Sequence, residues 1–336
     1  MSGWLSAATD SFSATTGREA RRSTPQCGLH WLDWPVMTRE TVHVHPLVTM
    51  DALRTCEQLQ LAVWGYADRE VVPAAQMRAA LHAGALVAGA FVGREQIGFL
   101  YGFPALPHEP DLQGAGMHSH MMAVAPEARG MGAGRRLKWF QRRWCQDRGL
   151  RWVSWTFDPL QTGNARLNLE YLGAVVHEYQ VDFYGVLGGQ LSGTLPTDRF
   201  VALWHLDHPH VRARAARDPA AAFGDERDED PARFATTVGA FAADAAWALE
   251  VAHGGGPTAP RFDLEAEVVL VAAPANVSAL RREAPQSALA WRECFKEVLP
   301  AYLARGYEVR GFRDGAYVLL RGRLNEAPQE ERPGEE

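Results

Sequence analysis

The apolar positions of this chain repeat with helical or strand periodicity from about residue 41 to residue 207. Leu53, Cys56 and Leu59 recur at helical spacing, and Thr49 stands where an N-cap is expected. Two apolar runs on either side of Gly93 are typical of a β-hairpin. The expected elements are a strand over 42–46, helices over 49–65 and 73–84, strands over 85–92, 96–104 and 117–124, a helix over 135–147, a strand over 150–159, a helix over 163–173, and strands over 174–185 and 198–206. This order predicts an α+β domain.

The remaining segments differ from that domain in composition. A charge cluster at 225–233 and a glycine run after His253 are typical of exposed connections, and an Ala-rich stretch at 234–252 between them predicts a helix. Beyond them, the periodicity predicts a strand, two helices and two strands. The expected parts are a flexible leader at 1–40, the α+β domain at 41–207, a linker with one helix at 208–265, a small C-terminal α+β unit at 266–324 and an acidic tail at 325–336.

Composition limits the function classes. The chain has 336 residues, of which 47% are hydrophobic, so it can bury a sizeable core. Its net charge of −6 disfavours a broad nucleic-acid-binding face. The 4 cysteines form no Cys-x-x-Cys pair, which argues against a zinc site and a disulfide scaffold and suits the reducing cytoplasm. No apolar run approaches the roughly 20 residues that span a bilayer. We therefore expect a cytoplasmic protein with no metal ion and no membrane or nucleic-acid partner.

A glycine-rich turn between a strand and a helix carries the strongest chemical signal. The strand ending at Val124 leads into Gly130, Gly132 and Gly134, and an amphipathic helix follows. Glycines leave backbone N–H groups uncovered, and a helix N-terminus adds free N–H groups and the positive end of its dipole. The turn is therefore expected to bind a phosphate or pyrophosphate. It is not a P-loop, because no Lys-Ser/Thr pair follows the last glycine, and its glycine spacing is not that of a dinucleotide-binding fingerprint.

The turn also matches a family pattern, Arg/Gln-x-x-Gly-x-Gly/Ala, at Arg129, Gly132 and Gly134. In this pattern and in the order of its elements, the chain resembles the GNAT superfamily of acyl-CoA-dependent N-acyltransferases. The resemblance implies a mixed, mostly antiparallel central sheet flanked by helices, and acetyl-CoA or another acyl-CoA as cosubstrate. It implies pantetheine contacts on the strand and pyrophosphate contacts in the turn. The cofactor-binding residues so implied are Met122, Ala123 and Val124, then Arg129, Gly130, Met131, Gly132, Ala133 and Gly134, with charge from Arg135 or Arg136, and Asn164 as a helix cap, a pantetheine contact or both.

His118 and His120 are the candidate general bases. They are two positions apart on a strand, so their side chains should face the same side, and imidazoles titrate near neutral pH. The family often places its base on this strand, although packing of one or both rings in the core stays open. For the general acid, the family commonly uses a tyrosine in the helix after the next strand. Counting forward from the start of that helix gives Tyr171, whereas counting back from its end gives Leu169, which cannot donate a proton.

A narrower resemblance concerns the substrate. A bacterial subgroup of GNAT acyltransferases with a C-terminal extension, some of which are thought to N-succinylate amino acids, is similar to this chain at 118–130, 157–168, 195–200 and 291–312. This implies an acyltransferase that moves an acetyl or succinyl group to the primary amine of an amino acid or related small molecule. A succinyl donor needs a cation for its distal carboxylate, for which Arg151, Arg166 and Arg199 are candidates.

Two questions stay open at this level. The chain could instead be a non-catalytic acyl-CoA-binding sensor or interaction module. The C-terminal unit could cover the acceptor site, pair with the central sheet or mediate a homodimer.

Overall fold

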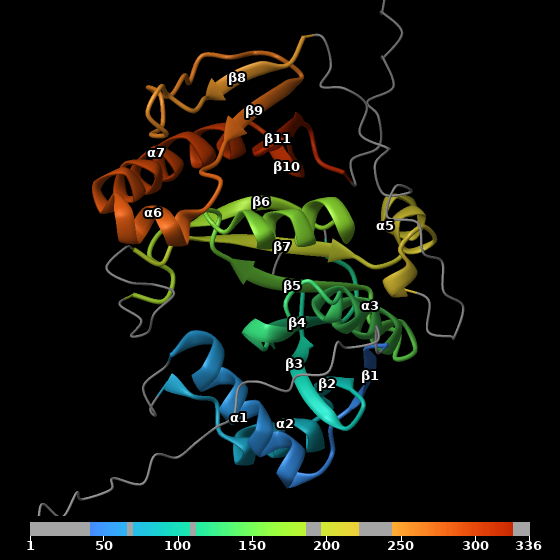
Figure 1. Cartoon of the computed structure of the whole chain (residues 1–336). Helices are drawn as coiled ribbons and strands as arrows, with labels where there is room; N and C mark the ends of the chain where they lie inside the picture. Colours follow the sequence, from blue (N-terminus) through green and yellow to red (C-terminus); the bar gives the residue numbers. More distant parts are fainter. Residues whose placement is uncertain (1–40, 66–69, 108–111, 186–195, 222–243, 325–336) are drawn as a thin grey trace, which may run out of the picture. The chain divides into compact units, whose positions relative to one another are not determined.

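A computed structural model describes residues 41–65, 70–107, 112–185, 196–221 and 244–324 (Figure 1). The expected leader and tail, and most of the helix expected at 234–252, lie outside these residues. The strands are β1 (His43–Pro46), β2 (Leu86–Val92), β3 (Glu95–Ala105), β4 (Gly116–Val124), β5 (Trp152–Phe157), β6 (Val175–Gln180), β7 (Arg199–His205), β8 (Ala246–Leu249), β9 (Val268–Ala272), β10 (Tyr307–Arg313) and β11 (Ala316–Arg321). The α-helices are α1 (Met50–Trp64), α2 (Ala74–His82), α3 (Ala133–Gln146), α4 (Thr162–Ala165), α5 (Pro209–Ala215), α6 (Val277–Glu283) and α7 (Pro285–Ala304).

The first helix shows how local signals set its ends. The Thr49 side chain accepts a hydrogen bond from the Ala52 N–H at 3.4 Å, as its N-cap position predicts. The helix ends at Gly65, whose φ of 63° is the left-handed conformation that favours glycine. Through β7, the observed order of strands and longer helices is the order that the sequence predicts.

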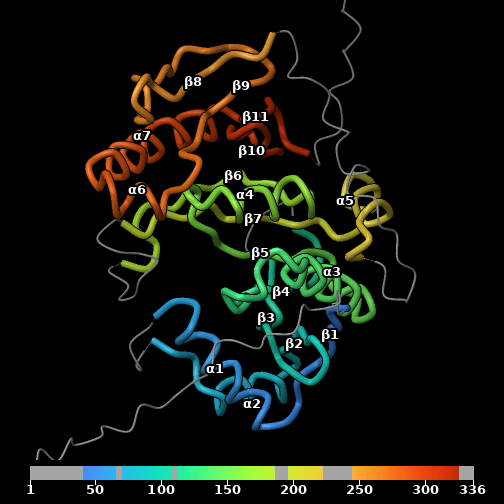
Figure 2. Tube along the Cα trace, viewed as in Figure 1, coloured from blue at the N-terminus to red at the C-terminus, as the bar shows by residue number. Residues whose placement is uncertain are grey.

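All described strands belong to one sheet, in the order β1-β2-β3-β4-β5-β7-β6-β10-β11-β9-β8 (Figures 1 and 2). Within it, β4 with β5 and β8 with β9 are the parallel pairs, and the other neighbours are antiparallel. The predicted mixed, mostly antiparallel sheet is therefore confirmed. A parallel pair needs a long crossover, which α3 provides between β4 and β5.

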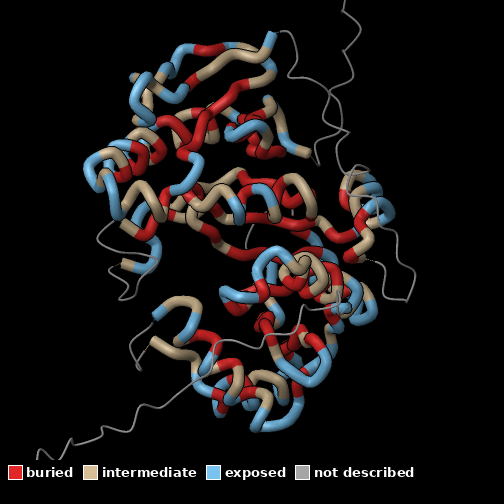
Figure 3. The backbone as a smooth tube through the Cα atoms, in the orientation of Figure 1, coloured by how far each residue is buried: buried red, intermediate tan, exposed pale blue. Residues whose placement is uncertain are grey.

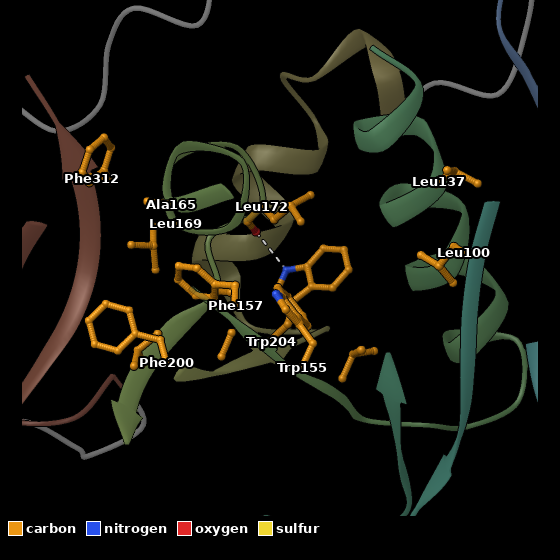
Figure 4. Close-up of a cluster of buried hydrophobic side chains, with 14 of the residues drawn as sticks. Leu100, Leu137, Trp155, Phe157, Ala165, Leu169, Leu172, Phe200, Trp204 and Phe312 are labelled. Carbon is orange, nitrogen blue, oxygen red and sulfur yellow. Dashed lines mark hydrogen bonds between the residues drawn. The ribbon is translucent and has the colours of Figure 1, made fainter. Parts of the chain in front are cut away.

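Helices pack on the sheet, and most residues of β2, β3, β5, β9, β10 and β11 are buried, which Figure 3 shows as red backbone. Helix α3 packs against β2, β3 and β4, and α1 packs against β3 and β4. Under α3, the rings of Trp139, Trp155 and Trp204 are in contact. The Trp204 indole N–H donates to the Leu172 carbonyl at 2.9 Å, which satisfies the one polar atom of a fully buried side chain (Figure 4).

The segment after β5 corrects one expectation. Asn164 is not an N-cap: the helix starts at Thr162, with Gln161 at the cap position, and Asn164 is an exposed residue inside it. The reason is the preceding turn, in which the Asp158 side chain accepts from the Leu160 N–H at 2.9 Å and brings the chain round early. Helix α4 then continues as a π-helix, Arg166–Tyr171, and ends before Gly173, whose φ is 74°.

The residues after β7 correct a second expectation. Within the stretch predicted as a helix over 234–252, residues Ala246–Leu249 form strand β8, which pairs in parallel with β9. Alanine content favours a helix locally, but pairing with a buried neighbour decides in favour of the strand. The segment predicted as the start of a linker is also packed. Asp218 there is buried and accepts from the Trp139 indole N–H at 2.8 Å.

The C-terminal unit pairs with the central sheet, because β10 lies beside β6 with Val309 opposite Val176. The unit also holds the turn after β5. The Asp158 carboxylate accepts from Arg292 at 2.8 Å and from Arg281 at 3.2 Å, and the Tyr317 hydroxyl donates to the Pro159 carbonyl. The C-terminal extension therefore supports the segment that leads into α4.

Candidate functional site

Strands β4 and β5 separate in the middle of the sheet. They pair only at Met117 with Val153 and at His118 with Ser154. Beyond these pairs, β4 continues to Val124 with β3 on one edge, while its other edge has no strand partner in the described chain. Unpaired N–H and C=O groups on a strand edge can pair with another extended chain or ligand arm. Met122, Ala123 and Val124, the residues expected to contact pantetheine, lie on this open edge.

A β-bulge lies where the two strands part. In the pairing of β3 with β4, Tyr101 lies opposite Met121 and Phe103 lies opposite His118. An advance of two residues along β3 therefore corresponds to three residues along β4. The extra residue falls at Ser119 and His120. A bulge bends its strand and increases the local twist, which directs β4 away from β5 at this point.

The glycine turn follows the open edge after one short 3₁₀ helix, Pro126–Ala128. Gly130 and Gly132 have φ values of 87° and 80°, and no atom lies closer than 4.0 Å to a Cβ built on either. The N–H groups of Gly130, Gly132, Ala133 and Gly134 make no hydrogen bond within the described residues. They border the N-terminus of α3, and together they form an uncovered donor surface suited to phosphate oxygens.

Two expected N–H donors of the turn are used internally. The Arg129 N–H bonds the Pro126 carbonyl at 3.3 Å, and the Met131 N–H bonds the Ala128 carbonyl at 3.4 Å. Gly134 differs from the other two glycines because its φ is not positive, and an added Cβ would meet Met122 at an ordinary 3.5 Å. Alanine therefore fits at Gly134, as the pattern Gly/Ala allows, whereas Gly130 and Gly132 need glycine.

Arg135 places a positive charge beside the turn. A guanidinium nitrogen lies 4.0 Å from the position of a Cβ on Gly132, and another lies 3.6 Å from the buried Asp218 carboxylate. The guanidinium also lies over the Tyr171 ring, 4.7 Å from its centroid, and Arg166 lies 5.5 Å from the same centroid. Tyr171 thus stands beside the turn between two cations, while Leu169, the alternative position, is fully buried.

The two histidines lie together on one side of the sheet, as their spacing predicts. Their ring centroids are 6.4 Å apart, and both pack on Phe103, at 5.5 Å for His118 and 5.8 Å for His120. His118 Nδ1 lies 3.2 Å from the Ser154 hydroxyl. Burial lowers the pKa of His120 below its usual value, so its imidazole is neutral at neutral pH and can accept a proton.

The opposite side of β4 holds a buried polar cluster that the sequence reasoning missed. Lys138 is 3% exposed, and its ammonium donates to the Ser119 hydroxyl at 2.9 Å and to Gln141 at 3.2 Å. The ammonium lies 3.7 Å from the Trp155 ring centroid. Burial lowers the pKa of Lys138 to about 7. Helical spacing could have indicated this burial. Leu137, Gln141 and Cys145 recur every four residues on the buried side of α3, and Lys138 lies next to them on that side.

Within the described residues, no group of three or more His, Cys, Asp or Glu side chains is placed to hold a metal ion. No helix in the same part of the chain is long and apolar enough to cross a membrane.

Residues 51–173 match the model of the acetyltransferase (GNAT) family. Among similar solved structures, the ribosomal-protein-S18-alanine N-acetyltransferase of Escherichia coli is 13% identical, with 50% of this chain and 96% of that chain covered and a TM-score of 0.39. The IAA acetyltransferase of Bacillus cereus is 15% identical, with 49% of this chain and 99% of that chain covered and a TM-score of 0.37. A GNAT family acetyltransferase of Elizabethkingia anophelis with acetyl-CoA bound is 16% identical, with 49% and 99% covered and a TM-score of 0.37. No curated protein matches the chain.

Proposed function

Because residues 51–173 match the model of the acetyltransferase (GNAT) family, we propose that this chain is an acyl-CoA-dependent N-acyltransferase. It moves an acetyl or succinyl group from coenzyme A to the primary amine of an amino acid or a related small molecule. The observation that carries the proposal is the open edge of β4, which runs directly into the uncovered N–H groups at the start of α3.

This arrangement fits the two chemically distinct parts of coenzyme A. The extended, amide-containing pantetheine arm can pair with the free edge at Met122 to Val124 as a strand would. The pyrophosphate fits the N–H groups of Gly130, Gly132, Ala133 and Gly134, with the Arg135 guanidinium close by. A donor held in this way directs its thioester end along β4, toward the bulge and the histidines.

The chemistry at that end needs few protein groups. An acyl-CoA supplies the acyl group already activated as a thioester. The acceptor amine attacks the carbonyl carbon, so that a C–N bond forms, the C–S bond breaks, and one proton leaves the nitrogen. We assign acceptance of this proton to His120, whose lowered pKa keeps its imidazole neutral. The neighbouring His118 ring is positioned by its contact with the Ser154 hydroxyl. Thiolate departure with uptake of a proton completes the transfer.

A thiol-release assay with 5,5′-dithiobis(2-nitrobenzoic acid) tests the proposal. Acetyl-CoA and succinyl-CoA would each be combined with a panel of amino acids and simple amines, and we expect acceptor-dependent release above hydrolysis. Calorimetric binding of CoA without release from any pair would contradict the enzyme and favour the acyl-CoA-binding module instead.

A matched pair of glycine substitutions tests the phosphate site. We expect Gly132→Glu to abolish CoA binding, because its carboxylate would enter the donor surface of the turn. Gly149→Glu is the control, because Gly149 also has a positive φ of 71° and open space around it, but it lies at the other end of α3. Both variants carry a backbone strain of about 1 kcal/mol. Unchanged CoA affinity in Gly132→Glu would refute the assignment of the turn.

A further inference from the structure

The sheet face that carries the histidines continues across β5 and β7. His118 contacts Ser154, and Thr156 lies two positions further along the same face of β5. Thr156 is directly opposite Val201 of β7, and Arg199 lies two positions from Val201 in an unbroken register. Side chains alternate along a strand, so Arg199 projects from the same face as Thr156, Ser154 and His118.

Side-chain contacts agree with this register. The Tyr184 hydroxyl lies 3.0 Å from the Thr156 hydroxyl, and the Arg199 guanidinium lies 5.2 Å from the centroid of the Tyr184 ring. Two hydroxyls and one guanidinium therefore gather at one end of the face, with the histidines at the other. Arg199 is four residues along β7 from Leu203, the partner of Ser154, which is about 13 Å along the sheet. An arginine side chain and an imidazole at the two ends of this face are therefore placed to contact opposite ends of one molecule.

Arg199 is a cation without a counterion. Across the described residues, its guanidinium makes no hydrogen bond and no ion pair, and its Nε is shielded from solvent without a partner. Three carboxylates on neighbouring segments have other partners. Glu178, opposite Val201 on the same face as Arg199, accepts a hydrogen bond from the Gln180 side chain. Asp158 binds Arg281 and Arg292, and Asp198 accepts from the Tyr179 hydroxyl at 2.7 Å. A half-buried guanidinium is stabilised when an anion occupies its donor groups.

The surroundings of Arg199 are positive as well. Burial lowers the pKa of the nearby Arg281, and the Asp158 carboxylate raises it. The positive charges of Arg292 and Arg199 lower it further. The other arginines considered for a carboxylate are placed differently. Arg166 pairs with Glu170 at 3.2 Å, and Arg151 is an exposed residue just before β5, at the end of that strand away from Thr156.

We propose that Arg199, together with the hydroxyls of Tyr184 and Thr156, binds a carboxylate of the substrate, and that this carboxylate belongs to an amino-acid acceptor whose amine is held at the histidines. The inference rests on the proposed acyltransferase function and names its specificity-determining residue. A dicarboxylic acyl donor would present the same group, so the experiment separates the two sources.

The experiment compares each amino acid with its α-amide, using acetyl-CoA and then succinyl-CoA, in the wild type and in Arg199→Gln. With acetyl-CoA, we expect the variant to lose about 10- to 100-fold in kcat/KM for the amino acid, through KM, and to change little for the amide. Arg199→Lys should retain part of the selectivity, because it keeps the charge but not the paired donors. Arg151→Gln is the matched control and should leave both acceptors unchanged, and CoA affinity measured by calorimetry should be the same in all variants.

The outcomes are distinct. If Arg199→Gln lowers kcat/KM only with succinyl-CoA, and equally for acid and amide acceptors, Arg199 binds the carboxylate of the donor. This result would support the carboxylate site but overturn its assignment to the acceptor. Equal losses for acid and amide with both donors, or a wild type that prefers amides, would overturn the inference and leave the acyltransferase standing. Absence of thiol release from every pair, with CoA still bound, would overturn the acyltransferase itself and the inference with it.

Discussion

Lys138 should make the stability of this protein depend on pH in a direction opposite to that of an ordinary surface lysine. Its ammonium is buried against Ser119, Gln141 and the Trp155 ring, and no carboxylate in the described chain forms an ion pair with it. Burial lowers its pKa from 10.5 to about 7. Between these two values the unfolded chain binds one more proton than the folded chain, so the free energy of unfolding rises with pH.

The magnitude follows from the two pKa values. For a folded value of about 7 and an unfolded value of 10.5, the lysine contribution to the free energy of unfolding increases by about 2.5 kcal/mol from pH 6 to pH 9. Lys138→Met removes this dependence. Loss of the hydrogen bonds to Ser119 and Gln141 has a cost that is the same at both pH values, so it cancels when the two are compared. The free energy of unfolding of the variant, minus that of the wild type, should therefore be about 2.5 kcal/mol higher at pH 6 than at pH 9.

Urea unfolding at the two pH values measures this difference. Lys296→Met is the control, because Lys296 is the other of the two lysines in the chain and its side chain is 40% exposed beside Glu293. NMR of ¹³C-labelled lysine should also show one signal that titrates near pH 7. Two signals that both titrate above pH 10, or a Lys138→Met effect that is equal at pH 6 and pH 9, would refute the reasoning.

Three further predictions concern the site and its support. His120→Gln should lower kcat/KM by about 10²- to 10⁴-fold and remove the acidic limb of the pH–rate profile. In the wild type this limb lies below pH 6.5, because burial lowers the pKa of His120. An unchanged limb in the variant would exclude His120 as the base. Tyr171→Phe should keep activity within about 10-fold, since the ring that contacts Arg135 is preserved, whereas a loss of 10²-fold or more would give the phenol the general-acid role. Asp158→Asn should destabilise the fold by about 3 kcal/mol in urea, because Arg292 is 1% exposed and loses its carboxylate, while Asp51→Asn, in an exposed pair, should have no measurable effect.

Much of the fold could be predicted from local patterns. The order of strands and helices through β7 follows from apolar periodicity, and the cap at Thr49 and the stop at Gly173 follow from residue chemistry. The glycine turn was equally local, because positive φ at Gly130 and Gly132 is a requirement on single residues. The histidine pair could be predicted to share a face because strand side chains alternate, and the bulge beside them does not separate the rings.

In each failure, a competing contact outweighed the preference of the residue itself. Asn164 is a good cap residue, but Asp158 closes the preceding turn, and the cap position falls at Gln161, three residues earlier. Residues 246–249 are Ala-rich, but a buried partner strand was available and pairing with β9 decided their conformation. Lys138 was unremarkable as one residue of a polar helix, since its hydrogen-bond partner Ser119 lies nineteen positions away in the sequence.

By itself, the sequence determined the elements through β7, their order and the glycine turn before α3, because each depends on residues within about one helical turn of one another. Only the tertiary structure decided that β5 leaves β4 after Ser154, that β10 joins the C-terminal unit to β6, and that Arg199 lies on the same sheet face as His118. These features depend on which strands pair and which charges find partners. Both are settled by the free energy of the whole packed sheet, in which residues far apart in the chain compete for the same neighbours.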